Sequence, residues 1–187
     1  MYLILIAIVI IIVIYLSLKW NKLQSRAKSI KAFQFEYSQL SRIIDESIKI
    51  INQTKNIETG ISRFDVIKED VKRIIEIAPQ PIKFSISLPE NQDLSINTLN
   101  DLNKIDETKK IWIRLFFRER ITTELQKANL LSDAKLKTIQ LKKALNVVLK
   151  AIEYIPEDQY IKESITGIEQ MLSILKSSHD DTTTTLN

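Results

Sequence analysis

The side chains that could perform catalysis are few and scattered. The chain has no cysteine, which excludes a thiol nucleophile, a disulfide framework and a thiolate metal site. Its single histidine, His179, lies in a polar C-terminal tail, where nothing positions it as a general base. Glycine occurs only at Gly60 and Gly167, too sparsely for a phosphate-binding loop. We therefore expect no catalytic residue, no cofactor and no metal site.

Three pairs of carboxylates are adjacent in the sequence: Asp45 and Glu46, Glu69 and Asp70, and Glu157 and Asp158. Adjacency along a helix does not place two carboxylates in one buried site, which is what perturbed pKa values would require. We expect each pair on a polar helix face or at a helix cap. The sequence therefore favours a non-enzymatic protein.

The segment KKIWIRLFFRER, residues 109–120, combines cations with aromatic side chains. On a helix its apolar face contains Trp112, Phe116 and Phe117, while Arg114 and Arg118 lie beside that face. We favour a core helix whose cations are solvated, but the face could also bind a protein partner or lie on the inner membrane surface. Nucleic acid is the weakest candidate, because no recognised motif is present and the net charge is only +4.

Residues 79–97 interrupt the helical pattern. Ile82, Phe84, Ile86 and Leu88 alternate with polar residues, a period of two that is typical of a strand. Because no second strand is evident, we expect an extended segment that packs across a bundle or offers an edge to a partner, rather than a sheet. Residues 89–97 are expected to form a flexible loop. Ile82, Phe84 and Ile86 are thus candidate partner-binding residues.

The first eighteen residues carry no charge and read as a membrane anchor over residues 1–20. The next thirteen residues contain five cations and no acid, which places the following domain in the cytoplasm and the N-terminus outside. The same cations could also bind anionic lipid headgroups. The residues expected at the membrane interface are Tyr15, Lys19, Trp20, Lys22, Arg26 and Lys28.

Neither glycine nor proline occurs between Lys19 and Thr54, so one helix can continue from the anchor into the cytoplasm. Apolar residues recur along it at seven-residue intervals, at Leu23, Ile30, Tyr37, Ile44 and Ile51. We favour one face of an intramolecular bundle, and the same stripe could form a homodimeric coiled coil.

Further helices follow from the spacing of apolar residues and from the caps. After a turn at residues 56–60, a helix begins near Ser62 and ends before Pro79. Helical pattern resumes from Thr98 to about Leu131, and Ser132 with Asp133 marks the next N-cap. Two antiparallel helices joined at Pro156 complete the chain. The expected fold is all-α, with a transmembrane helix, a cytoplasmic bundle of four or five helices over residues 21–178, and a disordered tail at 179–187.

The stretch TKNIETGISRFDVIKEDVKRI resembles a segment of uncharacterised helical proteins of Gram-positive bacteria and their phages. An acidic residue in a turn, here Glu58, precedes a helix start that reads Ser62, Arg63, Phe64, Asp65. The resemblance covers about twenty residues and implies no activity. Together, these patterns predict a membrane-anchored adaptor that binds lipid and a protein partner, with a phage-type membrane effector as the alternative.

Overall fold

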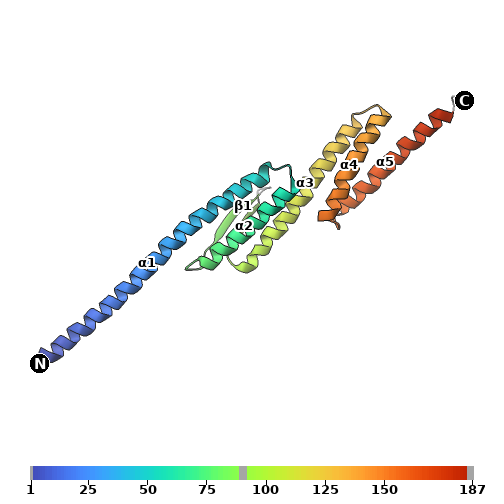
Figure 1. Ribbon diagram of the computed structural model, residues 1–187. Coiled ribbons are helices and arrows are strands. Elements are labelled where there is room, and N and C mark those ends of the chain that lie inside the picture. Colours follow the sequence, from blue (N-terminus) through green and yellow to red (C-terminus); the bar gives the residue numbers. More distant parts are fainter. Residues whose placement is uncertain (1, 89–91, 185–187) are drawn as a thin grey trace. The chain divides into compact units, whose positions relative to one another are not determined.

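The computed structural model describes the backbone of residues 2–88 and 92–184 and the side chains of residues 12–87 and 93–177 (Figure 1). The chain separates into two compact units, unit 1 (Met1–Thr54 and Ser62–Ile105) and unit 2 (Lys55–Ile61 and Asp106–Asn187). The elements in chain order are α1 (Tyr2–Gln53), α2 (Ile57–Ile77), β1 (Phe84–Leu88), β2 (Gln92–Ile96), the 3-10 helix η2 (Leu99–Leu102), α3 (Asn103–Asn129), α4 (Ala134–Tyr154) and α5 (Gln159–Thr184). The fold is mostly helical, as predicted.

Helix α1 runs without a break for 52 residues, a length of about 78 Å. Its C-terminal part packs in unit 1 against α2 and the two strands, whereas its N-terminal part extends beyond them (Figure 1). An ion pair between Arg73 and Glu36, at 2.5 Å, joins α2 to α1. The buried side chains of unit 1 come from all of these elements and include Leu40, Ile44, Ile51, Phe64, Ile67, Val71, Ile74, Phe84, Ile86 and Ile96.

The seven-residue stripe divides into two parts with different surroundings. Ile44 and Ile51 are each 2% exposed and belong to the core of unit 1. Leu23 and Ile30 are about half exposed, at 52% and 46%, and Tyr37 lies at the boundary. The preferred interpretation, a bundle face, therefore holds for the C-terminal part of the stripe.

The start of α2 differs from the prediction. The helix begins at Ile57 because the side-chain oxygen of Asn56 accepts hydrogen bonds from the backbone N–H groups of Glu58 and Thr59. Asparagine is a strong N-cap, so the helix starts five residues before Ser62. The expected end is confirmed, since α2 stops at Ile77 before Pro79.

The prediction of an unpaired extended segment is wrong, because β1 and β2 form an antiparallel hairpin. Phe84 lies opposite Ile96 and Ile86 lies opposite Leu94, so one face of the hairpin is apolar. The expected loop therefore contains a second strand. Residues 89–91 lie outside the described part of the chain.

Unit 2 contains most of α3 together with α4 and α5, and α4 and α5 pack as the predicted antiparallel pair (Figure 1). The carboxylate of Asp133 accepts a hydrogen bond from Leu136 N at 2.7 Å, which confirms the predicted N-cap of α4. The buried face of α4 contains Leu141, Ala144, Val148 and Ala151, and the two alanines allow close helix approach. The side chains of residues 178–187 are not among those described, so the disordered tail stays a prediction, although the α5 backbone is helical to Thr184.

No helix among the described residues contains a stretch long and apolar enough to cross a bilayer. The predicted anchor, residues 1–20, falls mostly on residues 1–11, whose side chains lie outside the described part.

Candidate interaction surfaces

The segment at residues 109–120 forms part of the core of unit 2. Trp112 and Phe117 are 8% and 2% exposed. The Trp112 ring packs against the backbone of Gly60, where an added Cβ would collide with it. Phe117 lies beside Tyr154, with ring centroids 5.6 Å apart. The favoured interpretation, a core helix, agrees with this burial, and these two aromatic residues are not available to a partner or membrane.

Two of the three arginines of this segment, Arg114 and Arg118, bind a buried carboxylate. Arg114 Nε lies 2.5 Å from Asp158 Oδ2, and Arg118 Nη2 lies 3.8 Å from Asp158 Oδ1. The same carboxylate caps α5 by accepting a hydrogen bond from Ile161 N at 3.2 Å. Arg118 also stacks over Tyr160, 4.8 Å from the ring centroid. Both arginines therefore hold α3 against the start of α5.

The outer aromatic residue of the segment is Phe116, which is half-buried. It packs on Trp112, with ring centroids 5.2 Å apart, and the guanidinium of Arg120 lies 4.2 Å from its centroid. A ring covered on two sides offers little area to a partner. None of the five predicted residues in this segment therefore forms an open apolar face.

The residues of the extended segment that were predicted to bind a partner are mostly buried in unit 1. Phe84 and Ile86 are 6% and 3% exposed, and Phe84 packs edge-on against Tyr37 with centroids 6.0 Å apart. Ile82 is half-buried and lines a groove of about 580 Å³ in unit 1. The other residues lining this groove are Arg26, Ser29, Ile30, Phe33, Gln34, Pro79 and Gln80.

The titratable groups with shifted pKa values are dispersed. Burial raises the pKa of Asp70, and Arg73 opposes this effect. Hydrogen bonds from Lys104 and from the backbone of Asn97 hold the pKa of Asp101 far below its usual value. Hydrogen bonding to Lys127 lowers the pKa of Glu124. Among the described residues no three histidine or acidic side chains converge where a metal ion could be held.

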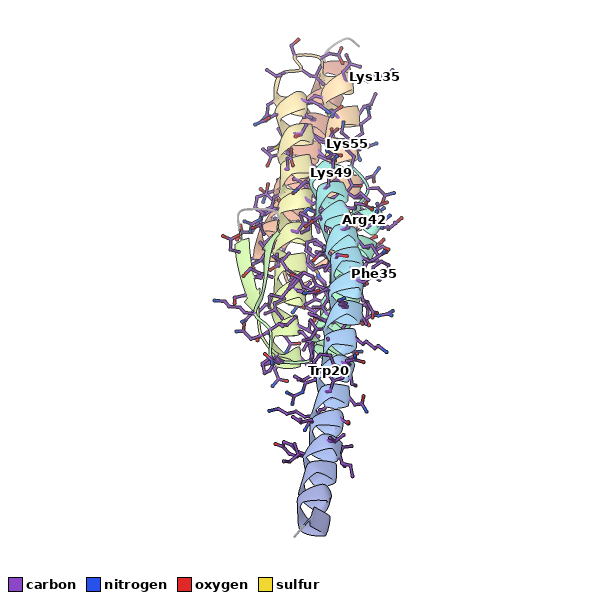
Figure 2. All side chains as sticks on the ribbon, turned by 90° about the vertical axis from the view of Figure 1, so that its left-hand side faces the viewer. Trp20, Phe35, Arg42, Lys49, Lys55 and Lys135 are labelled. Atoms are coloured by element: carbon purple, nitrogen blue, oxygen red, sulfur yellow. The ribbon has the colours of Figure 1, made fainter. Side chains whose placement is uncertain are left out.

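The N-terminal half of α1 exposes both apolar and cationic side chains. Tyr15 and Trp20 are each 63% exposed, consistent with accessible interface residues. Figure 2 labels Trp20 together with three later residues along α1, Phe35, Arg42 and Lys49. Five cations are exposed between Leu18 and Ala32 of the helix, and no ion pair involves them among the described residues; they are Lys19, Lys22, Arg26, Lys28 and Lys31.

A second surface, on α4, was not predicted from the sequence. Leu136, Ile139 and Leu149 are 53%, 46% and 48% exposed on the side of α4 away from its buried face. Lysines lie beside and between them along the helix, and Figure 2 labels one of these, Lys135, which directly precedes Leu136. In the sequence, this surface is indicated only by leucine and isoleucine residues of α4 that do not belong to the apolar spacing of its buried face. We call this the α4 outer face, formed by Lys135, Leu136, Ile139, Lys142, Lys143 and Leu149; Lys150, beside it, already pairs with Glu58 at 3.4 Å.

Comparison with known proteins gave no match to a family model, to a curated protein or to a solved structure. The function is therefore argued from these surfaces.

Proposed function

We propose that this protein is a non-enzymatic adaptor that is anchored in a membrane by the start of α1 and presents its helical units to a protein partner in the cytoplasm. The observation that carries the proposal is the surface of α1 at residues 12–18. Successive apolar residues on all sides of the helix are half exposed or more, namely Ile12, Val13, Ile14, Tyr15, Leu16 and Leu18.

A helix that is apolar all round requires an apolar environment, because water penalises such a surface on every side. Residues 12–18 continue an uncharged run that begins at Met1. A run of this length, about 27 Å as a helix, suits the hydrocarbon core of a bilayer. The cations that follow favour a cytoplasmic location for the rest of the chain.

The α4 outer face is the best-supported protein-binding surface. It combines exposed apolar side chains with lysines, and a partner segment with apolar and acidic residues would complement both. The residues at 82–86 and 112–118 contribute less, because their large side chains are mostly buried.

The anchor is tested by membrane flotation after an alkaline wash. We expect the full chain to float with the membranes and Ile10→Asp to be partly released, because aspartate near the centre of a span costs about 3 kcal/mol. Phe35→Asp is the matched control, since Phe35 is 68% exposed and lies beyond the uncharged run. Equal release of all three proteins would contradict the anchor. A C-terminal reporter that is active only in the cytoplasm tests the orientation.

The protein-binding surface is tested by crosslinking in native membranes followed by mass spectrometry. We expect Ile139→Asp with Leu149→Asp to lose a crosslinked partner that the wild-type chain and Phe35→Asp retain. Circular dichroism checks that the double variant remains folded. If the folded double variant keeps every wild-type crosslink, the α4 outer face is not the binding surface.

A further inference from the structure

The five cations after the uncharged run form a basic collar on α1, made of Lys19, Lys22, Arg26, Lys28 and Lys31. All five side chains are exposed. The chain contains no acidic residue before Glu36, and Glu36 is paired with Arg73. No carboxylate of unit 1 therefore neutralises the collar within the described residues.

Many cations elsewhere in the chain do have carboxylate neighbours. Lys110 lies 2.8 Å from Glu107, and Lys127 lies 2.6 Å from Glu124. Arg114 is 2.5 Å from the buried Asp158. The collar thus differs from these cations in lacking an internal counter-charge, and its charge is available to an external anion.

The positions of the collar residues around the helix indicate what kind of anion fits. Successive residues turn by about 100°, so Lys19, Lys22 and Arg26 fall within a sector of about 60°. Lys28 and Lys31 lie on the opposite side of the helix. A single docked acidic helix could reach the sector of Lys19, Lys22 and Arg26 but not Lys28, whereas lipid headgroups surround an inserted helix on all sides.

The positions of the collar residues along the helix place them at graded depths. With a rise of 1.5 Å per residue, Lys19 and Lys22 lie within about 6 Å of Leu18, and Arg26 and Lys28 lie about 12 and 15 Å from it. The headgroup layer on each side of a bilayer is about 5–8 Å thick. Electrostatic attraction extends about 8 Å further at physiological ionic strength. Lys31, about 20 Å away, is beyond both ranges.

We propose that the basic collar binds the headgroups of anionic phospholipids in the inner leaflet, with Lys19 and Lys22 in direct contact and Arg26 and Lys28 acting through the surface potential. This inference rests on the proposed anchor, because an anchored Leu18 sets the depth of the collar. Trp20, which is 63% exposed, lies at the same depth as the two contacting lysines, about 100° around the helix from Lys19, and reports on the lipids that surround the helix at that depth.

The test uses the full chain in phosphatidylcholine nanodiscs containing a small, equal fraction of dansyl-labelled phosphatidylglycerol or dansyl-labelled phosphatidylcholine. Energy transfer from Trp20 to dansyl measures which lipid is enriched around the helix. The Trp20→Phe variant supplies the background from Trp112. We expect the labelled phosphatidylglycerol to be enriched, and Lys19→Gln with Lys22→Gln to reduce this enrichment by about fivefold or more.

Two controls define the site. Lys49→Gln removes an exposed cation from the same helix far beyond the headgroups, and Lys31→Gln removes the most distant collar residue; both should leave the enrichment unchanged. Raising the salt concentration should reduce the enrichment, because the attraction is electrostatic.

Equal energy transfer from the two labelled lipids in the wild-type chain would overturn the inference while leaving the anchor intact, and the collar would then only orient the chain. An unchanged preference in the double variant would overturn it as well. Failure of the full chain to enter nanodiscs of any composition would refute the anchor and the inference together.

Discussion

At Gly60 the missing side chain determines how the first turn of α2 packs against α3 in unit 2. The indole of Trp112 occupies the space that a Cβ would need. We expect Gly60→Ala to lower the free energy of unfolding by about 1–3 kcal/mol, because the large ring must move out of a packed position. Urea denaturation followed by circular dichroism measures this change.

The other glycine provides the matched control. Gly167 lies in α5 and an added Cβ would meet no atom within 4 Å. Gly167→Ala should therefore stabilise the protein by about 0.5–1 kcal/mol, since alanine loses less backbone entropy in a helix. Opposite signs for the two substitutions are the expected result. Destabilisation by both would show that helix α5 tolerates alanine poorly for a reason other than packing at Trp112.

The Asp158 carboxylate joins three interactions in one buried position. It pairs with Arg114 and Arg118 and caps α5, while its own side chain is only 4% exposed. We expect Asp158→Ala to cost about 2 kcal/mol, less than a fully buried ion pair, because both arginines remain partly in water. Glu107→Gln breaks the exposed pair with Lys110 and should cost much less than Asp158→Ala, because water screens this pair. Equal costs would mean that the burial of Asp158 contributes nothing.

Some residue roles could be predicted from sequence and others could not. Asp133 was identified as a cap because it directly precedes a periodic helix. Asn56 was missed because Gly60, four residues later, reads as a turn residue. Only the contact with Trp112, far away in the chain, explains why glycine lies inside a helix.

At the level of elements, the helices were predictable because each repeats its apolar spacing over many residues. The hairpin was not, since β2 contributes only Leu94 and Ile96 to the alternation. Residues 92–96 form a strand because they pair with β1, and the sequence of residues 92–96 alone does not reveal this pairing. The candidate partner-binding residues show the same limit. The alternation of Phe84 and Ile86 correctly indicated a strand, but local spacing could not indicate that other parts of unit 1 cover its apolar face.

The start of η2 and α3 has a pH-sensitive contact. Asp101 accepts hydrogen bonds from Asn97 N, Thr98 N and Lys104 Nζ, at 2.9, 3.0 and 2.7 Å. These donors hold the pKa of Asp101 far below its value in the unfolded chain, so the folded state favours the carboxylate. Its contribution to stability is complete at neutral pH and is lost as the pH falls below about 4.

We therefore expect Asp101→Asn to be less stable than the wild-type chain at pH 7, and the difference to shrink as the pH falls from about 5 towards 2. Unfolding by urea at a series of pH values measures it. Asp45→Asn, at an exposed position of α1, serves as a control for the general loss of one negative charge. A difference for Asp101→Asn that stays constant with pH would contradict the lowered pKa.

For the whole molecule, the decisive question is whether the seven-residue stripe of α1 joins two chains or packs within one. Sequence spacing could not distinguish these cases, because a coiled-coil seam and a bundle face have the same period. The exposure of the stripe residues changes along α1, and this change distinguishes the two cases. Ile44 and Ile51 are covered within unit 1, so a homodimer could use only the exposed residues Leu23 and Ile30.

Electrostatics opposes that shorter dimer. Arg26 occupies the stripe between Leu23 and Ile30, and a parallel pair of anchored helices would bring two such arginines together. Neither chain offers an acidic residue before Glu36 to offset this repulsion. We therefore expect the anchored protein to be a monomer, with the exposed apolar residues at Leu23 and Ile30 too few to overcome the repulsion between cations.

Single-cysteine crosslinking tests this expectation cleanly, because the natural chain has no cysteine. In membranes, Leu23→Cys and Ile30→Cys should give no more disulfide-linked dimer than Phe35→Cys, an exposed position outside the stripe. Ile44→Cys should react with neither a second chain nor a soluble thiol reagent, since this position is 2% exposed. If Leu23→Cys and Ile30→Cys crosslink efficiently while Phe35→Cys does not, the exposed part of the stripe is a dimer seam. In that case apolar contact outweighs the repulsion between the two Arg26 side chains, and removing that charge with Arg26→Gln should increase the yield of dimer further.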